Sequence, residues 1–96
     1  MLWLEAGNKK EATRVAKEVL DYDLKYLTYL NSLGSAHIQT YRRTTYFVVM
    51  SIIEASRSLM ESDAAQYAVY QKRIDNISRT EAFALGFETY QSQMQQ

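Results

Sequence analysis

The sequence contains no cysteine and no proline, and only three of its 96 residues are glycines: Gly7, Gly34 and Gly86. Without cysteine the chain can form no disulfide, thiol nucleophile or zinc–thiolate site. A β-rich chain of this length needs more turn-forming residues than three glycines, whereas long helices need none. The composition therefore predicts an all-α fold, with one domain over residues 1–96.

An excess of charge of either sign is also absent, because eleven basic residues balance eleven acidic ones. This balance gives no overall argument for binding to nucleic acid or to an anionic membrane. The apolar start Leu2-Trp3-Leu4 is followed at once by Glu5 and is too short for a signal peptide. We therefore expect a cytoplasmic protein with no membrane role. A membrane-surface contact through Leu2, Trp3 and Leu4 is a third, weaker alternative.

Residues that carry catalysis are scarce. His37 is the only histidine, and no acidic residue lies within a helical turn of it. Asp21 and Asp23, two residues apart, point to different faces of a helix and cannot act as joint ligands. No glycine-rich phosphate loop, zinc-protease pattern or EF-hand spacing is present. The sequence predicts a protein that is not an enzyme and has no metal or cofactor.

Capping patterns mark the start and end of the first helix. Asn8, followed three residues later by Glu11, has the pattern of a capping box. Gly34 suits the position after a helix end, where a left-handed backbone is favoured. Ser35 is the candidate N-cap of the second helix. We therefore expect helices over residues 8–33 and 35–61, joined by a connection too short for anything but antiparallel neighbours.

Two further capping patterns follow. Asp63 with Gln66 predicts a third helix, although a continuous helix through residue 62 remains an alternative. The sequence Ser78-Arg79-Thr80-Glu81 repeats the capping-box pattern, and the apolar stripe changes direction there. We expect helices over residues 63–77 and 79–94, and an antiparallel three-helix bundle whose third helix is kinked or broken near Ser78.

The second helix contains the most apolar part of the chain. Residues 46–53 are apolar or aromatic except for Ser51. A helix that is apolar all round must be covered on more than one side. Its main apolar stripe comprises Ile38, Tyr41, Val48, Ile52, Ala55 and Leu59. The third helix has only a narrow apolar stripe, which cannot cover the wide apolar faces of the first two helices. We therefore expect a second copy of the chain to complete the core as a homodimer.

Eight tyrosines are the most distinctive feature of the composition. Tyr22, Tyr26 and Tyr29 line one edge of the first helix. Tyrosine combines a large apolar area with a polar tip and is enriched in interfaces. These three residues, with Phe47 and Met50, form the predicted interface. The alternative is that the tyrosines close the rim of the chain's own core.

Asp23 lies inside the apolar arc of the first helix. A buried carboxylate needs a partner, because leaving it unpaired costs several kcal/mol. Three interpretations remain open: a surface-edge residue in a slightly rotated helix, a structural ion pair with an arginine of the second or third helix, and a functional polar site.

Basic residues support a different function. Arg42, Arg43, Lys72 and Arg73 are possible nucleic-acid contacts, since basic side chains next to aromatic ones can hold phosphates and stack bases. The leading hypothesis is nevertheless a non-catalytic protein–protein interaction module that acts by stoichiometric binding, as an inhibitor, antitoxin-like partner, regulator or adaptor. A small nucleic-acid-binding regulator is the alternative.

Overall fold

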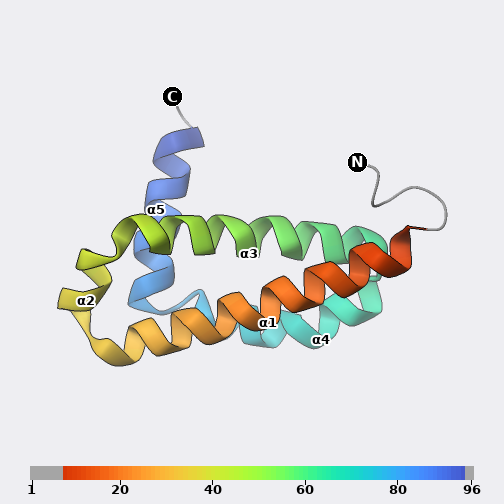
Figure 1. Ribbon diagram of the computed structural model, residues 1–96, viewed down its shortest axis with the longest axis horizontal. Coiled ribbons are helices and arrows are strands. Elements are labelled where there is room, and N and C mark those ends of the chain that lie inside the picture. The colour runs from red at the N-terminus through yellow and green to blue at the C-terminus, as the bar shows by residue number, and fades with distance from the viewer. Residues whose placement is uncertain (1–7, 95–96) are drawn as a thin grey trace.

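The computed structural model of the chain describes residues 8–94, which form five α-helices and no strand (Figure 1). In chain order these are α1 (Lys9–Leu33), α2 (Ser35–Thr40), α3 (Arg42–Ser62), α4 (Ala64–Ile77) and α5 (Glu81–Met94). The predicted all-α class is confirmed. None of the five helices has the length and hydropathy needed to cross a membrane. Leu2, Trp3 and Leu4 lie outside the described residues.

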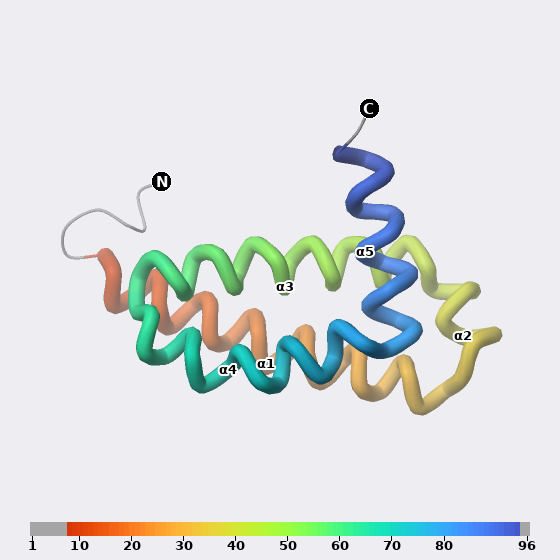
Figure 2. The backbone as a smooth tube through the Cα atoms, turned by 180° about the vertical axis from the view of Figure 1, so that it is seen from behind, coloured from red at the N-terminus to blue at the C-terminus, as the bar shows by residue number. Residues whose placement is uncertain are grey.

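The helices are arranged in two layers. α1, α2 and α3 form the layer that faces the viewer in Figure 1, and α4 and α5 lie behind it. The reverse view shows α4 running beside α1, and α5 crossing α3 steeply (Figure 2). The shortest dimension is 16 Å, which fits two layers of helices with axes about 8–10 Å apart but not three. The described residues therefore cover one side of the α1–α3 pair and place no helix over the other.

The core lies between α1 and α3 and under the second layer. Its largest fully buried side chains are Leu20, Leu27, Leu30, Ile38, Thr45, Val49, Ile52 and Leu59. α3 contacts α1, α4 and α5, so the helix that contains residues 46–53 is covered on more than one side, as expected. The predicted stripe is wrong at two positions. Val48 is only half-buried while its neighbour Val49 is fully buried, and Tyr41 is exposed.

Three predicted boundaries are confirmed. Gly34 follows α1 with φ 96°, a backbone conformation that residues with a Cβ rarely adopt. Asp63 ends α3 and caps α4, since its carboxylate accepts a hydrogen bond from the Gln66 N–H at 3.2 Å. The continuous helix through residue 62 is therefore excluded. The break near Ser78 is also present, because α4 ends at Ile77 and α5 begins at Glu81.

Two predicted caps are wrong. Asn8 occupies the N-cap position of α1, but its side chain makes no capping hydrogen bond, and Glu11 pairs with Arg14 instead. Ser35 is the first residue of α2 and does not cap it. Its hydroxyl donates a hydrogen bond to the Glu81 carboxylate at 2.8 Å. Glu11 and Ser35 thus each interact with another side chain instead of with the backbone at the helix start.

The predicted helix over residues 35–61 is interrupted at Tyr41, with φ −104° and ψ 29°. Threonines flank this point, and β-branched residues are poor helix formers. The hydroxyls of Thr40 and Thr45 donate hydrogen bonds to backbone carbonyls four residues earlier, a contact that bends helices. The break lets Ile38 reach the core at the end of the bundle while α3 keeps its own buried stripe.

α5 does not continue the direction of α4, and two contacts fix where it crosses. The Asn31 side-chain oxygen of α1 accepts a hydrogen bond from the Ala82 N–H at 3.0 Å. Gly86 lies so close to α3 that an added Cβ would be 2.5 Å from Val49 Cγ2 and 2.9 Å from the Thr45 carbonyl oxygen. α1, α3 and α4 alternate in direction, whereas α5 leaves their common axis and crosses α3.

Candidate functional site

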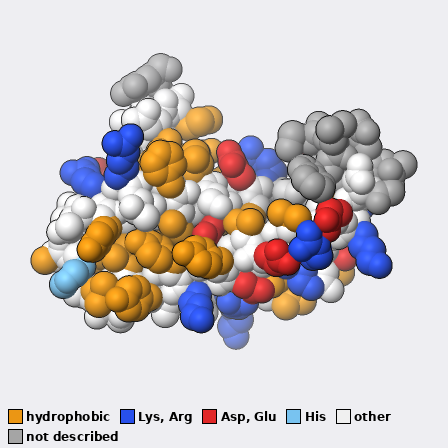
Figure 3. Space-filling model, viewed as in Figure 1, with side chains coloured by type: hydrophobic (Ala, Val, Ile, Leu, Met, Phe, Trp, Pro, Cys, Tyr) orange, Lys and Arg blue, Asp and Glu red, His pale blue; other side chains and the backbone are white. Residues whose placement is uncertain are grey.

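Four tyrosines gather near the α2 end of the α1–α3 pair. Tyr22, Tyr29 and Tyr41 are 70%, 59% and 47% exposed, and Tyr26 is half-buried against the core. Burial raises the pKa of the Tyr26 hydroxyl, and electrostatic interaction with Tyr41, Tyr22 and Tyr29 raises it further. The four side chains therefore form one cluster, which we call the tyrosine face. Figure 3 shows hydrophobic side chains gathered over α1 and α3 on the uncovered side.

A groove continues this face toward the N-terminal end of α1. Val15 and Val19 share a helical edge with Tyr22, Tyr26 and Tyr29, because they are spaced by three or four residues. The groove has a volume of about 240 Å³. Its full lining consists of Ala12, Val15, Ala16, Val19, Ser51, Glu54, Ala55 and Ser58. The uncovered side thus has protruding tyrosines at one end and a groove of small side chains at the other.

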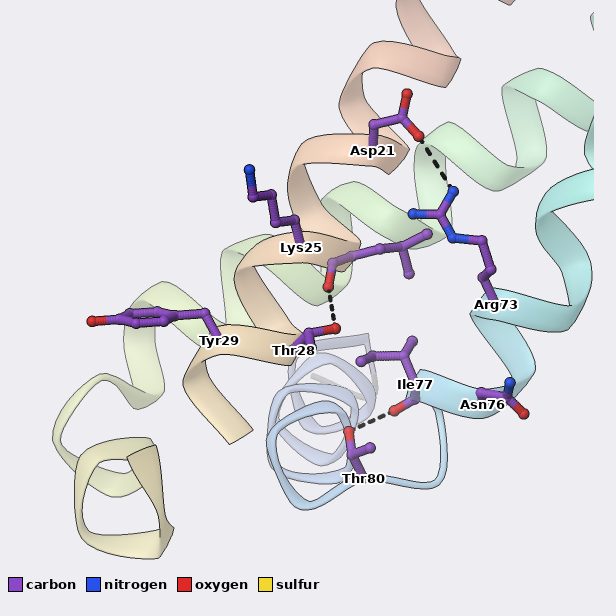
Figure 4. Close-up of a pocket in the computed structure, with 9 residues that line it drawn as sticks. Asp21, Lys25, Thr28, Tyr29, Arg73, Asn76, Ile77 and Thr80 are labelled. Atoms are coloured by element: carbon purple, nitrogen blue, oxygen red, sulfur yellow. Dashed lines mark hydrogen bonds and ion pairs between the residues drawn. The ribbon is translucent and has the colours of Figure 1, made fainter. Parts of the chain in front are cut away.

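The opposite edge of α1 forms a larger pocket with α4, of about 850 Å³ (Figure 4). Leu24 and Ile77 give it an apolar floor. The hydroxyls of Thr28 and Thr80 are already used, because they donate hydrogen bonds to the carbonyls of Leu24 and Ile77. Tyr29 of the tyrosine face also lines this pocket, and Figure 4 shows its side chain directed away from α4.

Asp21 organises the other wall of this pocket. Its carboxylate accepts a hydrogen bond from the Tyr70 hydroxyl at 2.8 Å and one from Arg73 at 3.4 Å. The Arg73 guanidinium also lies 5.3 Å from the centre of the Tyr70 ring, within the range of a cation–π contact. These three side chains hold α4 against α1, whereas Lys25 and Asn76 are exposed polar residues of the same lining.

Asp23 is buried, as one of its predicted interpretations required, and is 5% exposed. The predicted ion pair is wrong, because none of the ion pairs among residues 8–94 involves it. One carboxylate oxygen, Oδ2, has no hydrogen-bond partner. Burial raises the pKa of Asp23, and a hydrogen bond with Ser51 opposes this rise only in part. The surface-edge interpretation is excluded as well.

Phe47 and Met50 do not join the tyrosine cluster. Phe47 is 48% exposed and lies in the concave angle where α5 crosses α3. We call this site the α3–α5 corner; it has a volume of about 550 Å³ and is lined by Arg42, Arg43, Tyr46, Phe47, Thr89 and Gln93. Met50 is half-buried one turn further along α3. The predicted interface residues therefore occupy two places on the molecule.

The four basic residues of the alternative function are also divided. Arg42 and Arg43 line the α3–α5 corner, whereas Arg73 lines the pocket between α1 and α4. The two pockets share no lining residue. Lys72 is exposed on α4 beside Arg73. His37, the one histidine, is exposed on α2 with its Nδ1 at 3.1 Å from the Leu33 carbonyl oxygen.

Comparison with known proteins adds no relative, because no protein-family model, curated protein or solved structure matches the chain. Functional inference consequently rests on the molecule's own surfaces. Within the part of the chain that the structure describes, no three His, Asp or Glu side chains are grouped as metal ligands.

Sequence reasoning missed parts of both surfaces. Tyr41 was assigned to the buried stripe, but the break in the helix exposes it. No sequence pattern near Thr89 or Gln93 indicates a site, because these residues line the α3–α5 corner only through the crossing of α5 over α3. A helical wheel would have found Val15 and Val19 as the continuation of the tyrosine edge.

Proposed function

We propose that the chain is a non-catalytic protein-binding module that acts stoichiometrically through the tyrosine face. The observation that carries this proposal is the exposure of Tyr22, Tyr29 and Tyr41. Tyr22 and Tyr26 lie on the edge of α1 that continues the groove between α1 and α3, away from the α1 residues that face α4. Tyrosines of this kind supply apolar area at a small entropic cost and are frequent at the centre of interfaces. A cluster of exposed aromatic side chains is a common mark of a protein-binding site.

A second copy of the chain is the partner that best fits this side. In a two-fold dimer each residue that contacts the partner is contacted by the same surface in return. The uncovered side has tyrosines at one end and, at the other, a groove of alanine, valine and serine side chains with one acidic residue, Glu54. A two-fold axis between the two ends places the tyrosines of each copy over the groove of the other. This complementarity supports a homodimer.

Sedimentation equilibrium at tens of micromolar tests the proposal. Tyr29→Glu places a charge at the tyrosine end of the contact and should give a monomer, because an unpaired charge is costly to bury. Val69→Glu is the matched control, since Val69 is 67% exposed but lies on α4, in the other layer. The control should stay dimeric.

A charge exchange tests the arrangement of the two copies. Ser58→Arg at the groove should also give a monomer. Mixing the Ser58→Arg and Tyr29→Glu variants should restore a dimer. At one of the two contacts the new Glu of one chain then meets the new Arg of the other. At the second contact both chains keep the parent residues. Two variants that remain monomeric when mixed would contradict this arrangement. A parent chain that is monomeric at these concentrations would contradict self-association and leave the tyrosine face to a different protein.

The alternative of a nucleic-acid-binding regulator has less support. It needs Arg42, Arg43, Lys72 and Arg73 to act together, but they lie at two separate sites, and Arg73 is engaged by Asp21. Such a regulator would lose affinity steeply as salt is raised. Binding of duplex DNA that depends equally on the Arg42–Arg43 pair and on the Lys72–Arg73 pair would favour it.

A further inference from the structure

The α3–α5 corner combines charge and aromatic surface in a way that the protein-binding function does not use. Arg42 and Arg43 lie side by side in the first turn of α3 and both line the corner. No acidic residue lines it, and neither arginine takes part in an ion pair found among residues 8–94. In Figure 3 basic and hydrophobic side chains adjoin where α5 rises above α3.

The position of these arginines is unfavourable for the helix itself. The N-terminus of a helix carries a partial positive charge, which favours acidic side chains and disfavours basic ones. α3 has no acidic residue in its first turn and begins with two arginines. A bound anion would remove this repulsion by pairing with both guanidinium groups, which present planar sets of N–H donors to phosphate oxygens.

The same corner offers an aromatic surface beside the arginines. Tyr46 and Phe47 pack against each other with ring centres 5.1 Å apart and planes inclined by 55°. Phe47 is about half exposed, so a planar group could stack on it. Base–aromatic stacking is a recurring element of nucleotide binding that tolerates any base.

α5 completes the corner with hydrogen-bonding groups. Gln93 is exposed and its amide has both a donor and an acceptor. The Thr89 hydroxyl donates to the Leu85 carbonyl at 3.1 Å, and its oxygen can still accept. A heteroaromatic base has ring-edge donors and acceptors to meet such groups, whereas a phenyl ring has none. This difference favours a nucleotide over a phosphorylated tyrosine.

We propose that the α3–α5 corner binds a nucleotide unit, with its phosphate at Arg42 and Arg43 and its base against Tyr46 and Phe47. The volume of about 550 Å³ lies within the range of about 300–1,000 Å³ typical of small-molecule sites. The nucleotide is either free or part of a single strand. The proposal is independent of self-association through the tyrosine face, since the corner shares no lining residue with the groove.

Titration of the ¹⁵N-labelled chain with AMP, adenosine and inorganic phosphate tests this site. AMP should shift the backbone resonances around Arg43 and Phe47 at lower concentration than adenosine or phosphate, because only AMP fills both halves of the corner. Arg43→Gln should weaken AMP about tenfold, the size of one charge-assisted contact. Phe47→Leu should weaken AMP while leaving phosphate unchanged.

Arg57→Gln is the matched control, because Arg57 is an exposed arginine of the same helix outside the corner. It should not change AMP binding. An oligo(dT) of about twelve nucleotides distinguishes the source of the ligand: tighter binding than AMP, falling steeply with salt, indicates a single strand. AMP binding that Arg43→Gln leaves unchanged, no shifts at the corner, or tighter binding of phosphotyrosine would each overturn the proposal.

Discussion

At the scale of single residues, Gly86 fixes the crossing of α5 over α3. Gly86→Ala should raise helix propensity by about 1 kcal/mol, yet its Cβ would be 2.9 Å from the Thr45 carbonyl oxygen, a backbone atom that cannot rotate away. We expect a net loss of about 1–3 kcal/mol in the free energy of unfolding, as for other overpacked contacts. Urea denaturation measures this loss.

A double-mutant cycle separates the two causes. Val49→Ala removes the side chain that would be 2.5 Å from the new Cβ, so the two substitutions together should cost less than the sum of their separate effects. Strict additivity, or a Gly86→Ala variant more stable than the parent, would show that α5 does not approach α3 this closely.

Asp23 makes the stability of the chain depend on pH. Burial raises its pKa above the unfolded value of about 3.9, so the folded state binds the proton more tightly than the unfolded state does. The resulting stabilisation is present below the unfolded pKa and is lost as pH rises through the folded pKa. Asp23→Asn cannot titrate. As pH rises from about 4 to about 7, the free energy of unfolding of the parent chain should therefore fall relative to that of the variant.

Thermal denaturation of both chains across this range measures the difference, and Asp75→Asn, at an exposed aspartate of α4, controls for the loss of one negative charge. This slope is opposite to the one that an ion pair, one of the three interpretations left open by the sequence, would give. If the stability of Asp23→Asn relative to the parent instead falls as pH rises, Asp23 has a cationic partner.

At the scale of helices, Asn31 secures the start of α5. Its side-chain oxygen accepts the Ala82 N–H, one of the helix-start donors that has no partner within its own helix. Asn31→Ala should cost about 1 kcal/mol, as for other N-cap losses. Hydrogen exchange should quicken in α5 and change little in α1 and α3. Ser32→Ala is the control, since the Ser32 hydroxyl only bonds the Tyr29 carbonyl; equal effects from both substitutions would contradict the tether.

The helix boundaries show which parts of the fold the sequence could predict. Asp63 and Gln66 interact three residues apart, so their pattern is visible in the sequence. Gly34 adopts a conformation that favours glycine whatever surrounds it. The break at Tyr41 carries neither glycine nor proline and depends on burying Ile38. The course of α5 depends on contacts of Asn31 and Gly86 with segments far away in the chain, and no local pattern records them.

The same distinction applies to the candidate surfaces. The tyrosine edge of α1 follows from helical spacing alone, and the exposure of Tyr22 and Tyr29 agrees with it. The α3–α5 corner forms only because α5 crosses α3, so the sequence could indicate only the residues that α3 contributes to it. Asp23 was correctly placed in the apolar arc, but its lack of a cationic partner depends on how α1 and α3 are rotated against each other.

At the scale of the whole molecule, the two-layer arrangement makes stability depend on concentration. α4 and α5 cover one side of the α1–α3 pair, and the tyrosine face lies where no described helix covers it. If a second copy covers that side, folding and association are linked by mass action, and the thermal midpoint rises with protein concentration. A hundredfold increase should raise the midpoint of the parent chain by several degrees, since each 1 kcal/mol shifts a domain of this size by about 4–8 °C. Tyr29→Glu should show a lower midpoint that dilution does not change, while Val69→Glu should keep the concentration dependence. A parent midpoint that is unaffected by dilution would remove the second copy from the interface and assign the exposed tyrosines to a protein of different sequence.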